Sequence, residues 1–229
     1  MRVFVLDSAL GRCTAAVVII DDGVTGDGVT GDGVVAMRAE TRKQGHEAVL
    51  PLMARDVLTE AGGTIDCIGV TIGPGSFTGI RAGLALAHGI GLAAGVPVIG
   101  VTVGEAIALA LPNLDGRTLW TVTDGRRGHV FLERGAEALS LAVEALPAPP
   151  GRLAIAGGAA KQIAARLAAR DVDVLLTGAR FPLPHHIAVI AARRHAGLLP
   201  PRDAYPLYID PPQATLPAIA PRPPPETAA

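Results

Sequence analysis

Apolar and polar positions recur along the 229-residue chain with two periods, which predict strands and helices in turn. Short apolar runs bounded by Gly, Asp or Arg predict buried strands, whereas apolar residues spaced three and four apart predict helices. Strands are expected at residues 3–6, 14–20, 34–38, 67–72, 97–101, 118–123, 130–133 and 152–156. Helices are expected at residues 46–61, 82–95, 105–111, 159–170 and 187–196. This alternation is typical of α/β proteins.

An echo between the two halves of the chain indicates a duplicated domain. The first expected strand ends at Asp7 and the sixth ends at Asp124, and in both halves a turn and a second strand follow. The expected division is residues 1–104 for a first lobe, 105–212 for a second, smaller lobe with a helix returning to the first, and 213–229 for a proline-rich, disordered tail.

Residues 23–32 give the sequence Gly-Val-Thr-Gly-Asp twice. Five residues match no solenoid unit, and Asp-Gly pairs favour hairpin turns, so we expect a lengthened hairpin tip. A calcium loop is the alternative, because Asp21, Asp22, Asp27 and Asp32 lie close in sequence. The spacing and the final glutamate of an EF-hand are absent, however.

A glycine-rich loop, Gly-Pro-Gly-Ser-Phe-Thr-Gly at residues 73–79, joins the fourth expected strand to the next helix. Free N–H groups and the helix dipole favour negative charge there, and Gly73 and Gly75 would let a phosphate or another backbone come close. The dinucleotide-binding fingerprint fails because Thr78 stands where its third glycine belongs, and the lysine of a P-loop is missing. Ser76 and Thr78 are interpreted as helix caps.

The helix expected at residues 46–61 carries one apolar stripe, which includes Leu50 and Met53. Leu52 points the other way on a helical wheel. Single exposed leucines are common, so Leu52 needs no functional explanation unless a partner covers that face.

The helix after the glycine loop has a ridge of small residues: Gly79, Gly83, Ala87 and Gly91. Glycine in a helix costs about 1 kcal/mol relative to alanine, so close packing must offset the loss. Two explanations stay open, packing within the domain and a helix–helix contact with another subunit.

Charge and cysteine content narrow the function classes. Twenty basic and 21 acidic side chains give a net charge of −1, so any RNA should be held mainly by another subunit. Cys13 and Cys67 follow no ligand spacing, which fits a reducing compartment, and we expect the cytoplasm. Residues 82–104 lack charges and could span a membrane by length, but their six glycines and Pro97 favour a buried helix followed by a buried strand. No signal peptide is expected at the N-terminus.

Catalytic and metal-ligating patterns are weak throughout. The histidines stand at positions 46, 88, 129, 185, 186 and 195, where no two are spaced i, i+4. His185 and His186 are adjacent and would diverge on a helix or a strand, so no metal centre is expected. Ser76 follows glycine directly and therefore does not form a Gly-x-Ser-x-Gly nucleophile elbow.

The run from residue 73 to residue 108 resembles the signature of the bacterial TsaB family of tRNA threonylcarbamoyladenosine biosynthesis proteins. Gly-Pro-Gly-Ser-Phe-Thr-Gly is followed by Ile-Arg, an alanine- and glycine-rich helix, and Pro-Val-Ile-Gly-Val. Weaker matches are Val-Leu-Asp-Ser at residues 5–8, Asp-Gly-Arg-Arg at 124–127 and Tyr-Pro-Leu-Tyr-Ile at 205–209. Asp210 stands where the family usually has arginine, which reverses the charge there.

This resemblance implies an α/β, two-lobed actin-like ATPase fold with mixed sheets flanked by helices. It also implies a non-catalytic subunit without a cofactor, which forms a heterodimer with TsaD, a ternary complex with TsaE, and a possible homodimer when TsaD is absent. Contact with tRNA would be indirect. The alternatives are an autonomous small-molecule kinase or ATPase of the same fold, and a homodimeric structural module without a tRNA role.

Site residues follow from the same resemblance. Asp7, Ser8, Asp124 and Gly125 are expected in degenerate phosphate loops, because the bulky Leu10, Arg12, Arg126 and Arg127 stand nearby, and Gly157-Gly158 matches an adenosine-side turn. Asp7 and Asp124 could equally be turn residues at strand ends. The expected partner interface comprises Leu50, Leu52, Met53, Gly79, Arg81, Gly83 and Ala87.

Overall fold

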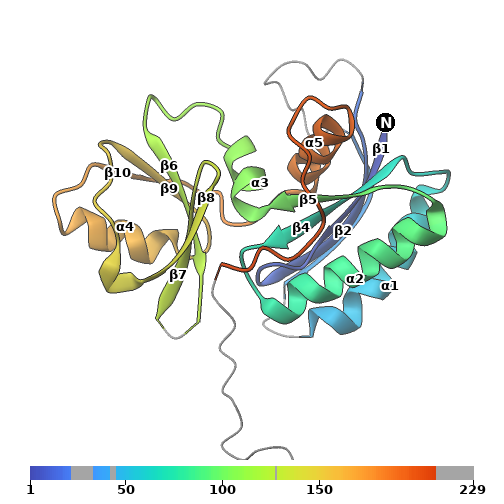
Figure 1. Ribbon diagram of the computed structural model, residues 1–229, viewed down its shortest axis with the longest axis horizontal. Coiled ribbons are helices and arrows are strands. Elements are labelled where there is room, and N and C mark those ends of the chain that lie inside the picture. Colours follow the sequence, from blue (N-terminus) through green and yellow to red (C-terminus); the bar gives the residue numbers. More distant parts are fainter. Residues whose placement is uncertain (22–32, 42–44, 127, 210–229) are drawn as a thin grey trace, which may run out of the picture.

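Two five-stranded mixed sheets, each flanked by helices, form two lobes in the computed structural model (Figure 1). The structure describes residues 1–21, 33–41, 45–126 and 128–209. The expectations for the repeat at 23–32, for Arg127, for Asp210 and for the tail at 213–229 lie outside the described residues.

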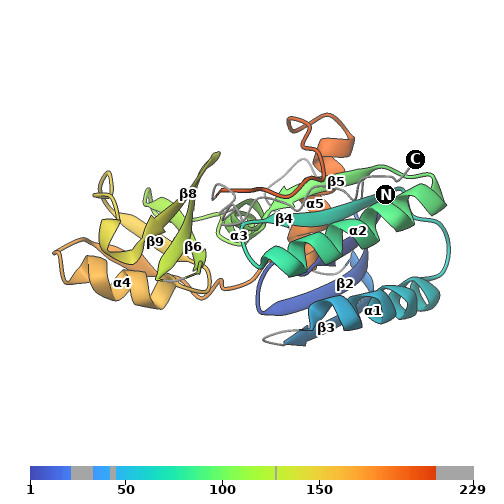
Figure 2. The same ribbon diagram turned by 60° about the horizontal axis from the view of Figure 1, so that its bottom comes forward.

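The first sheet has the strand order β3-β2-β1-β4-β5. Its strands are β1 (Arg2–Asp7), β2 (Arg12–Ile19), β3 (Val34–Thr41), β4 (Cys67–Gly73) and β5 (Val98–Thr102), and its helices are α1 (His46–Ala61), α2 (Phe77–Ala94), α3 (Val103–Leu109) and α5 (Pro184–His195). Helices α1 and α2 lie side by side on one face, and α5 covers the other (Figure 2).

The second sheet has the order β10-β9-β6-β7-β8. Its elements are β6 (Thr118–Asp124), β7 (His129–Arg134), β8 (Glu137–Ala142), a 3-10 turn (Val143–Ala145), β9 (Leu153–Ala156), α4 (Ala160–Ala168) and β10 (Val174–Leu176). Strands β8 and β10 were not predicted. β8 is only half-buried and β10 has three residues, so neither gives a clear apolar run.

Both sheets have the same topology, which confirms the duplication that the sequence indicates. In each, the first strand pairs antiparallel with the second and parallel with the fourth, as β1 does with β2 and β4 and β6 does with β7 and β9. Asp7 and Asp124 both end the first strand of their sheet.

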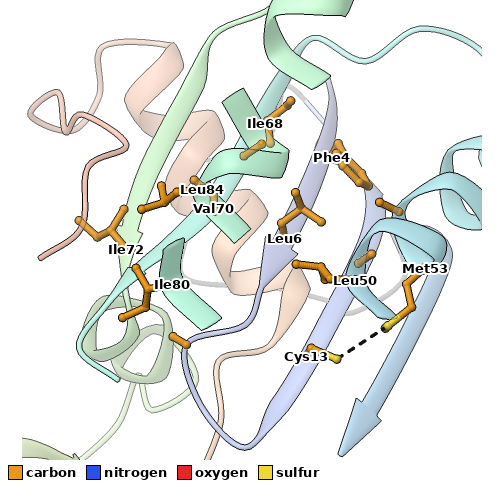
Figure 3. Packing of buried hydrophobic residues seen from close by; sticks show 14 of the residues in the cluster. Phe4, Leu6, Cys13, Leu50, Met53, Ile68, Val70, Ile72, Ile80 and Leu84 are labelled. Atoms are coloured by element: carbon orange, nitrogen blue, oxygen red, sulfur yellow. Dashed lines mark hydrogen bonds between the residues drawn. The ribbon is translucent and has the colours of Figure 1, made fainter. Parts of the chain in front are cut away.

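Three buried clusters hold these layers together. The first lies between the first sheet and α1 and α2, where Phe4, Leu6, Leu50 and Ile68 are fully or almost fully buried (Figure 3). In the same cluster, Cys13 Sγ lies 3.8 Å from Met53 Sδ. The second lies under α5, and the third lies between the second sheet and α4. Thus α5 follows the second sheet in sequence but stabilises the first.

Helix α3 connects the two lobes and belongs to the first by its packing. Val103 and Ile107 join the first cluster and Ala106 joins the second. The division expected between residues 104 and 105 therefore cuts through α3, and the structural break follows this helix. The Thr102 hydroxyl accepts a hydrogen bond from the Glu105 N–H, and the Glu105 carboxylate accepts one from the Thr102 N–H, which forms a capping box.

Among the described residues, α2 is the one helix long and apolar enough to cross a membrane by length and composition. This is weak evidence, because the core helix of a soluble protein passes the same test. The α2 face that carries Gly79, Ile80, Gly83 and Leu84 is buried within the lobe.

Candidate functional site

The glycine loop packs directly on the turn between β1 and β2. The Ser76 N–H donates to the Ala9 carbonyl at 2.6 Å, and the Ser8 hydroxyl donates to the Gly79 carbonyl at 2.7 Å. A Cβ atom at Gly75 would lie 2.0 Å from the Ala9 oxygen, and one at Gly79 would lie 2.1 Å from the Ser8 oxygen. Glycine at positions 75 and 79 therefore allows the loop to pack against the backbone of Ser8 and Ala9.

The start of α2 shows how this loop uses its polar groups. Ser76 is the N-cap, and its hydroxyl accepts from the Gly79 N–H at 3.2 Å. Thr78 is an exposed residue inside the helix, so its prediction as a cap is wrong. Gly73 and Gly75 have positive φ angles, and the Gly73–Pro74 peptide bond is cis.

The first of the expected phosphate loops is closed. Asp7 is 1% exposed, and its Oδ1 accepts from the Thr71 hydroxyl at 2.7 Å and from the Ala9 N–H at 3.1 Å. Ser8 is equally buried beneath α2. These hydrogen bonds are those of a residue in a strand-end turn, which is the alternative that the sequence left open.

The second expected loop is open to solvent. Asp124 is exposed, and the Gly125 N–H donates to the His129 carbonyl at 3.0 Å to close the β6–β7 hairpin. A Cβ atom at Gly158 would lie 2.9 Å from Asp124 Oδ2, and one at Gly157 would lie 2.2 Å from the Val122 oxygen. Folding thus brings Asp124 close to Gly157 and Gly158. This arrangement is consistent with the interpretation of the two glycines as an adenosine-side turn.

Most of the expected partner interface is buried within the chain itself. Leu50, Met53, Gly79, Gly83 and Ala87 are all buried, so they cannot contact a partner directly. The prediction that these five residues contact a partner is therefore corrected. They pack between α1, α2 and the first sheet. Leu52, with 53% of its surface exposed, and Arg81 remain on the outside.

A contact of Arg81 on α2 with two aromatic side chains, one of them in the segment after α5, was not predicted from the sequence. The Arg81 guanidinium lies 3.7 Å from the centre of the Phe77 ring and donates to the Tyr208 hydroxyl at 2.9 Å. Phe77 and Tyr208 are both exposed. Both stand inside the segments that carry the family resemblance, but 127 positions separate Arg81 from Tyr208, so only folding shows the contact.

The titratable side chains of the described residues do not form a clear set of metal ligands. Among the described residues, no group of three His, Cys, Asp or Glu could hold a metal ion. The rings of His185 and His186 are 5.9 Å apart, and burial lowers the pKa of both. Burial also raises the pKa of the Cys67 thiol to about 12, so this thiol stays protonated.

The duplicated five-stranded topology, with an aspartate at the end of each first strand, is that of the two-lobed actin-like ATPase fold that the family resemblance implies. Two solved structures from Pseudomonas aeruginosa share it: YeaZ, with a TM-score of 0.69 at 21% identity over 90% of this chain and 99% of that one, and a protein described as similar to the peptidase YeaZ, with a TM-score of 0.69 at 19% identity over 91% and 99%.

A family match places the chain within this fold class. The family described as "TsaD: tRNA N6-adenosine threonylcarbamoyltransferase" matches residues 31–186, more than half of the chain. The chain belongs to this family, and within it the chain is TsaB/YeaZ-like.

Curated relatives are similar to the chain over part of its length. The tRNA threonylcarbamoyladenosine biosynthesis protein TsaB of Escherichia coli is 32% identical over 135 residues, which are 57% of this chain and 53% of the relative. An uncharacterized protein of Mycobacterium tuberculosis is 40% identical over 116 residues, 48% of this chain and 51% of the relative. The chain spans about half the length of the curated relatives it matches.

Proposed function

We propose that this chain is a non-catalytic partner subunit in the formation of threonylcarbamoyladenosine in tRNA, where it binds TsaD and supports it together with TsaE. The family match and the TsaB relative support a role in this modification. The partners TsaD and TsaE are what the family resemblance implies, and the chain's own geometry supports the non-catalytic part of the proposal.

The closed first loop is the observation that carries the proposal. In active actin-like ATPases the two hairpin loops hold phosphates, and the loop after β1 must leave room for them. Here the turn after β1 is covered by the backbone of residues 75–79, at distances that exclude even a methyl group. A phosphate at this turn would have to displace the N-terminal turn of α2.

The outer face of α1 and α2 is the proposed docking surface for TsaD. Leu52 supplies exposed apolar area on α1, and Phe77 and Arg81 supply aromatic and cationic area on α2. Tyr208, in the segment after α5, contacts Arg81. Aromatic residues and arginine are enriched among the side chains that contribute most to protein interfaces. A net charge of −1 is consistent with tRNA being held by the other subunits.

The remaining parts of the proposal concern setting and assembly. Cys13 and Cys67 are buried free thiols, which fits a cytoplasmic location. We expect no cofactor, and we expect that the same α1 and α2 face could pair two copies of the chain when TsaD is absent.

A binding experiment with a matched control tests the proposal. Leu52→Glu should weaken binding to TsaD about ten- to hundred-fold in isothermal titration, because it places a charge in the interface. Leu198→Glu also changes an exposed leucine, but it follows α5 on the opposite face of the first sheet, and it should leave the affinity unchanged. Equal affinities for both variants would contradict the docking surface.

An activity experiment tests the non-catalytic role. The purified chain should neither hydrolyse ATP nor transfer threonylcarbamoyl from its adenylate to tRNA, and transfer should appear once TsaD and TsaE are added. Steady ATP turnover by the chain alone, abolished by Asp124→Asn, would favour the autonomous ATPase instead. That residue is the right probe because its loop is open.

A further inference from the structure

A buried carboxyl group crosses the boundary between the two lobes. Glu133 lies on β7 of the second lobe and is 6% exposed. Its Oε2 accepts a hydrogen bond of 2.7 Å from the Gly104 N–H in the first turn of α3, and the Thr102 side chain also hydrogen-bonds to it. Because α3 packs with the first lobe, one side chain of the second lobe is anchored in the first.

Glycine at position 104 makes this contact possible. A Cβ atom there would lie 2.6 Å from Glu133 Cδ and 2.8 Å from each of its oxygens. Any side chain at 104 would therefore push the carboxyl group away. The close fit shows that the contact is a built part of the lobe boundary.

A second carboxylate shares the same helix turn. Glu105 pairs with Arg194 at 2.5 Å and with Arg202 at 3.4 Å. Arg194 is 5% exposed on its side chain and also donates to the Gly100 carbonyl at 2.8 Å. Arg194 and Arg202 thus both pair with Glu105, while Glu133 accepts hydrogen bonds from the uncharged Gly104 and Thr102 close to the Glu105 carboxylate.

The surroundings of Glu133 favour its neutral form. Burial is the main cause that raises the pKa of Glu133, and the negative charge of Glu105 adds to it. The hydrogen bonds from Thr102 and Gly104 and the charge of Arg202 lower the pKa, and the net value is about 7. On the neighbouring strands, Glu133 faces Thr121 of β6 and Ala138 of β8, which carry no charge.

The sign of the pH dependence follows from this direction. Below pH 4.5, Glu133 is protonated in both the folded and the unfolded chain. Between pH 4.5 and about 7, the unfolded chain loses the proton that the folded chain keeps, so stability falls as pH rises. Above pH 7 both states are ionised and the loss stays constant.

We propose that Glu133 is a proton-controlled latch between the lobes, which holds β7 on α3 when it is neutral and loosens this contact when it is ionised. Ionisation of Glu133 would leave a buried negative charge on β7, close to the Glu105 carboxylate in the first turn of α3. Opening the boundary would relieve it by admitting water.

Urea unfolding of the isolated chain between pH 5 and pH 8.5 tests the titration. Glu133→Gln keeps an oxygen that can accept from the Gly104 N–H but cannot ionise. The unfolding constant of the wild type, relative to that of this variant, should rise about hundred-fold between pH 5 and pH 8, from a pKa difference of two to three units. Glu137→Gln, an exposed change on β8, should keep the wild-type pH dependence.

Small-angle X-ray scattering tests the latch itself. The radius of gyration of the wild type should increase from pH 6 to pH 8.5, and that of Glu133→Gln should stay constant. A constant wild-type radius would overturn the latch even if the stability data follow the prediction. If Glu133→Gln does not fold, carbon NMR of the wild-type carboxyl group decides, and titration near pH 4.5 would also overturn the proposal.

Discussion

Replacing Gly83 by alanine should destabilise the chain, although alanine is the better helix former. A Cβ atom at Gly83 would lie 2.6 Å from Ser8 Oγ, and that hydroxyl is held in place by its 2.7 Å hydrogen bond to the Gly79 carbonyl. Ser8 is buried, so it cannot move aside into solvent. The methyl group and the hydroxyl therefore compete for the same space.

The magnitude follows from three opposing contributions. Exchanging glycine for alanine in a helix gains about 1 kcal/mol. Losing the buried hydrogen bond of Ser8 costs about 1 kcal/mol, and overpacking costs about 1–3 kcal/mol. The expected net loss is about 1–3 kcal/mol, or about 2–12 °C in the unfolding temperature of a chain of this size.

Two further variants make the assay decisive. Gly89→Ala lies on the same helix with nothing within 4 Å of the new methyl group, so it should gain about 1 kcal/mol in urea unfolding. In a Ser8→Ala background the obstacle is gone, and Gly83→Ala should become neutral or stabilising. If Gly83→Ala stabilises the wild type as much as Gly89→Ala does, the close-packing explanation is refuted.

Two other substitutions probe the buried network and the glycine loop. Arg194→Met should cost about 3 kcal/mol at pH 7, because it removes the main partner of the half-buried Glu105. Burial opposes ionisation of Glu105, but the hydrogen bonds from Arg194 and Thr102 lower its pKa on balance, so this difference should shrink as pH falls below 4.5 in the same urea assay. Gly75→Ala should cost more than about 3 kcal/mol, since its methyl group would lie 2.0 Å from the Ala9 oxygen, and an unfolding temperature equal to that of the wild type would contradict this contact.

Local sequence patterns determined most of the elements. The spacing of apolar residues predicted α1 with the same bounds that the structure has, whereas the helix expected at residues 105–111 begins two residues earlier, at Val103. Strand, aspartate, turn and strand in each half predicted the duplication, because a repeated fold repeats its turn chemistry. Order within a segment of ten to twenty residues depends on neighbours in sequence, so the sequence alone could reveal it.

Tertiary structure alone decided what the singled-out residues contact. A ridge of glycines on a helix predicts close packing but does not identify the neighbouring residue. Here that residue is Ser8, some 70 positions away from Gly79. For the same reason, Leu50 and Met53 could be assigned to the buried stripe of α1 but not excluded from a partner interface. Glu133 looked like an ordinary strand residue until folding set it against Gly104, 29 positions away. The burial and the pKa of a side chain depend on which elements pack against it, and no local pattern in the sequence predicts that packing.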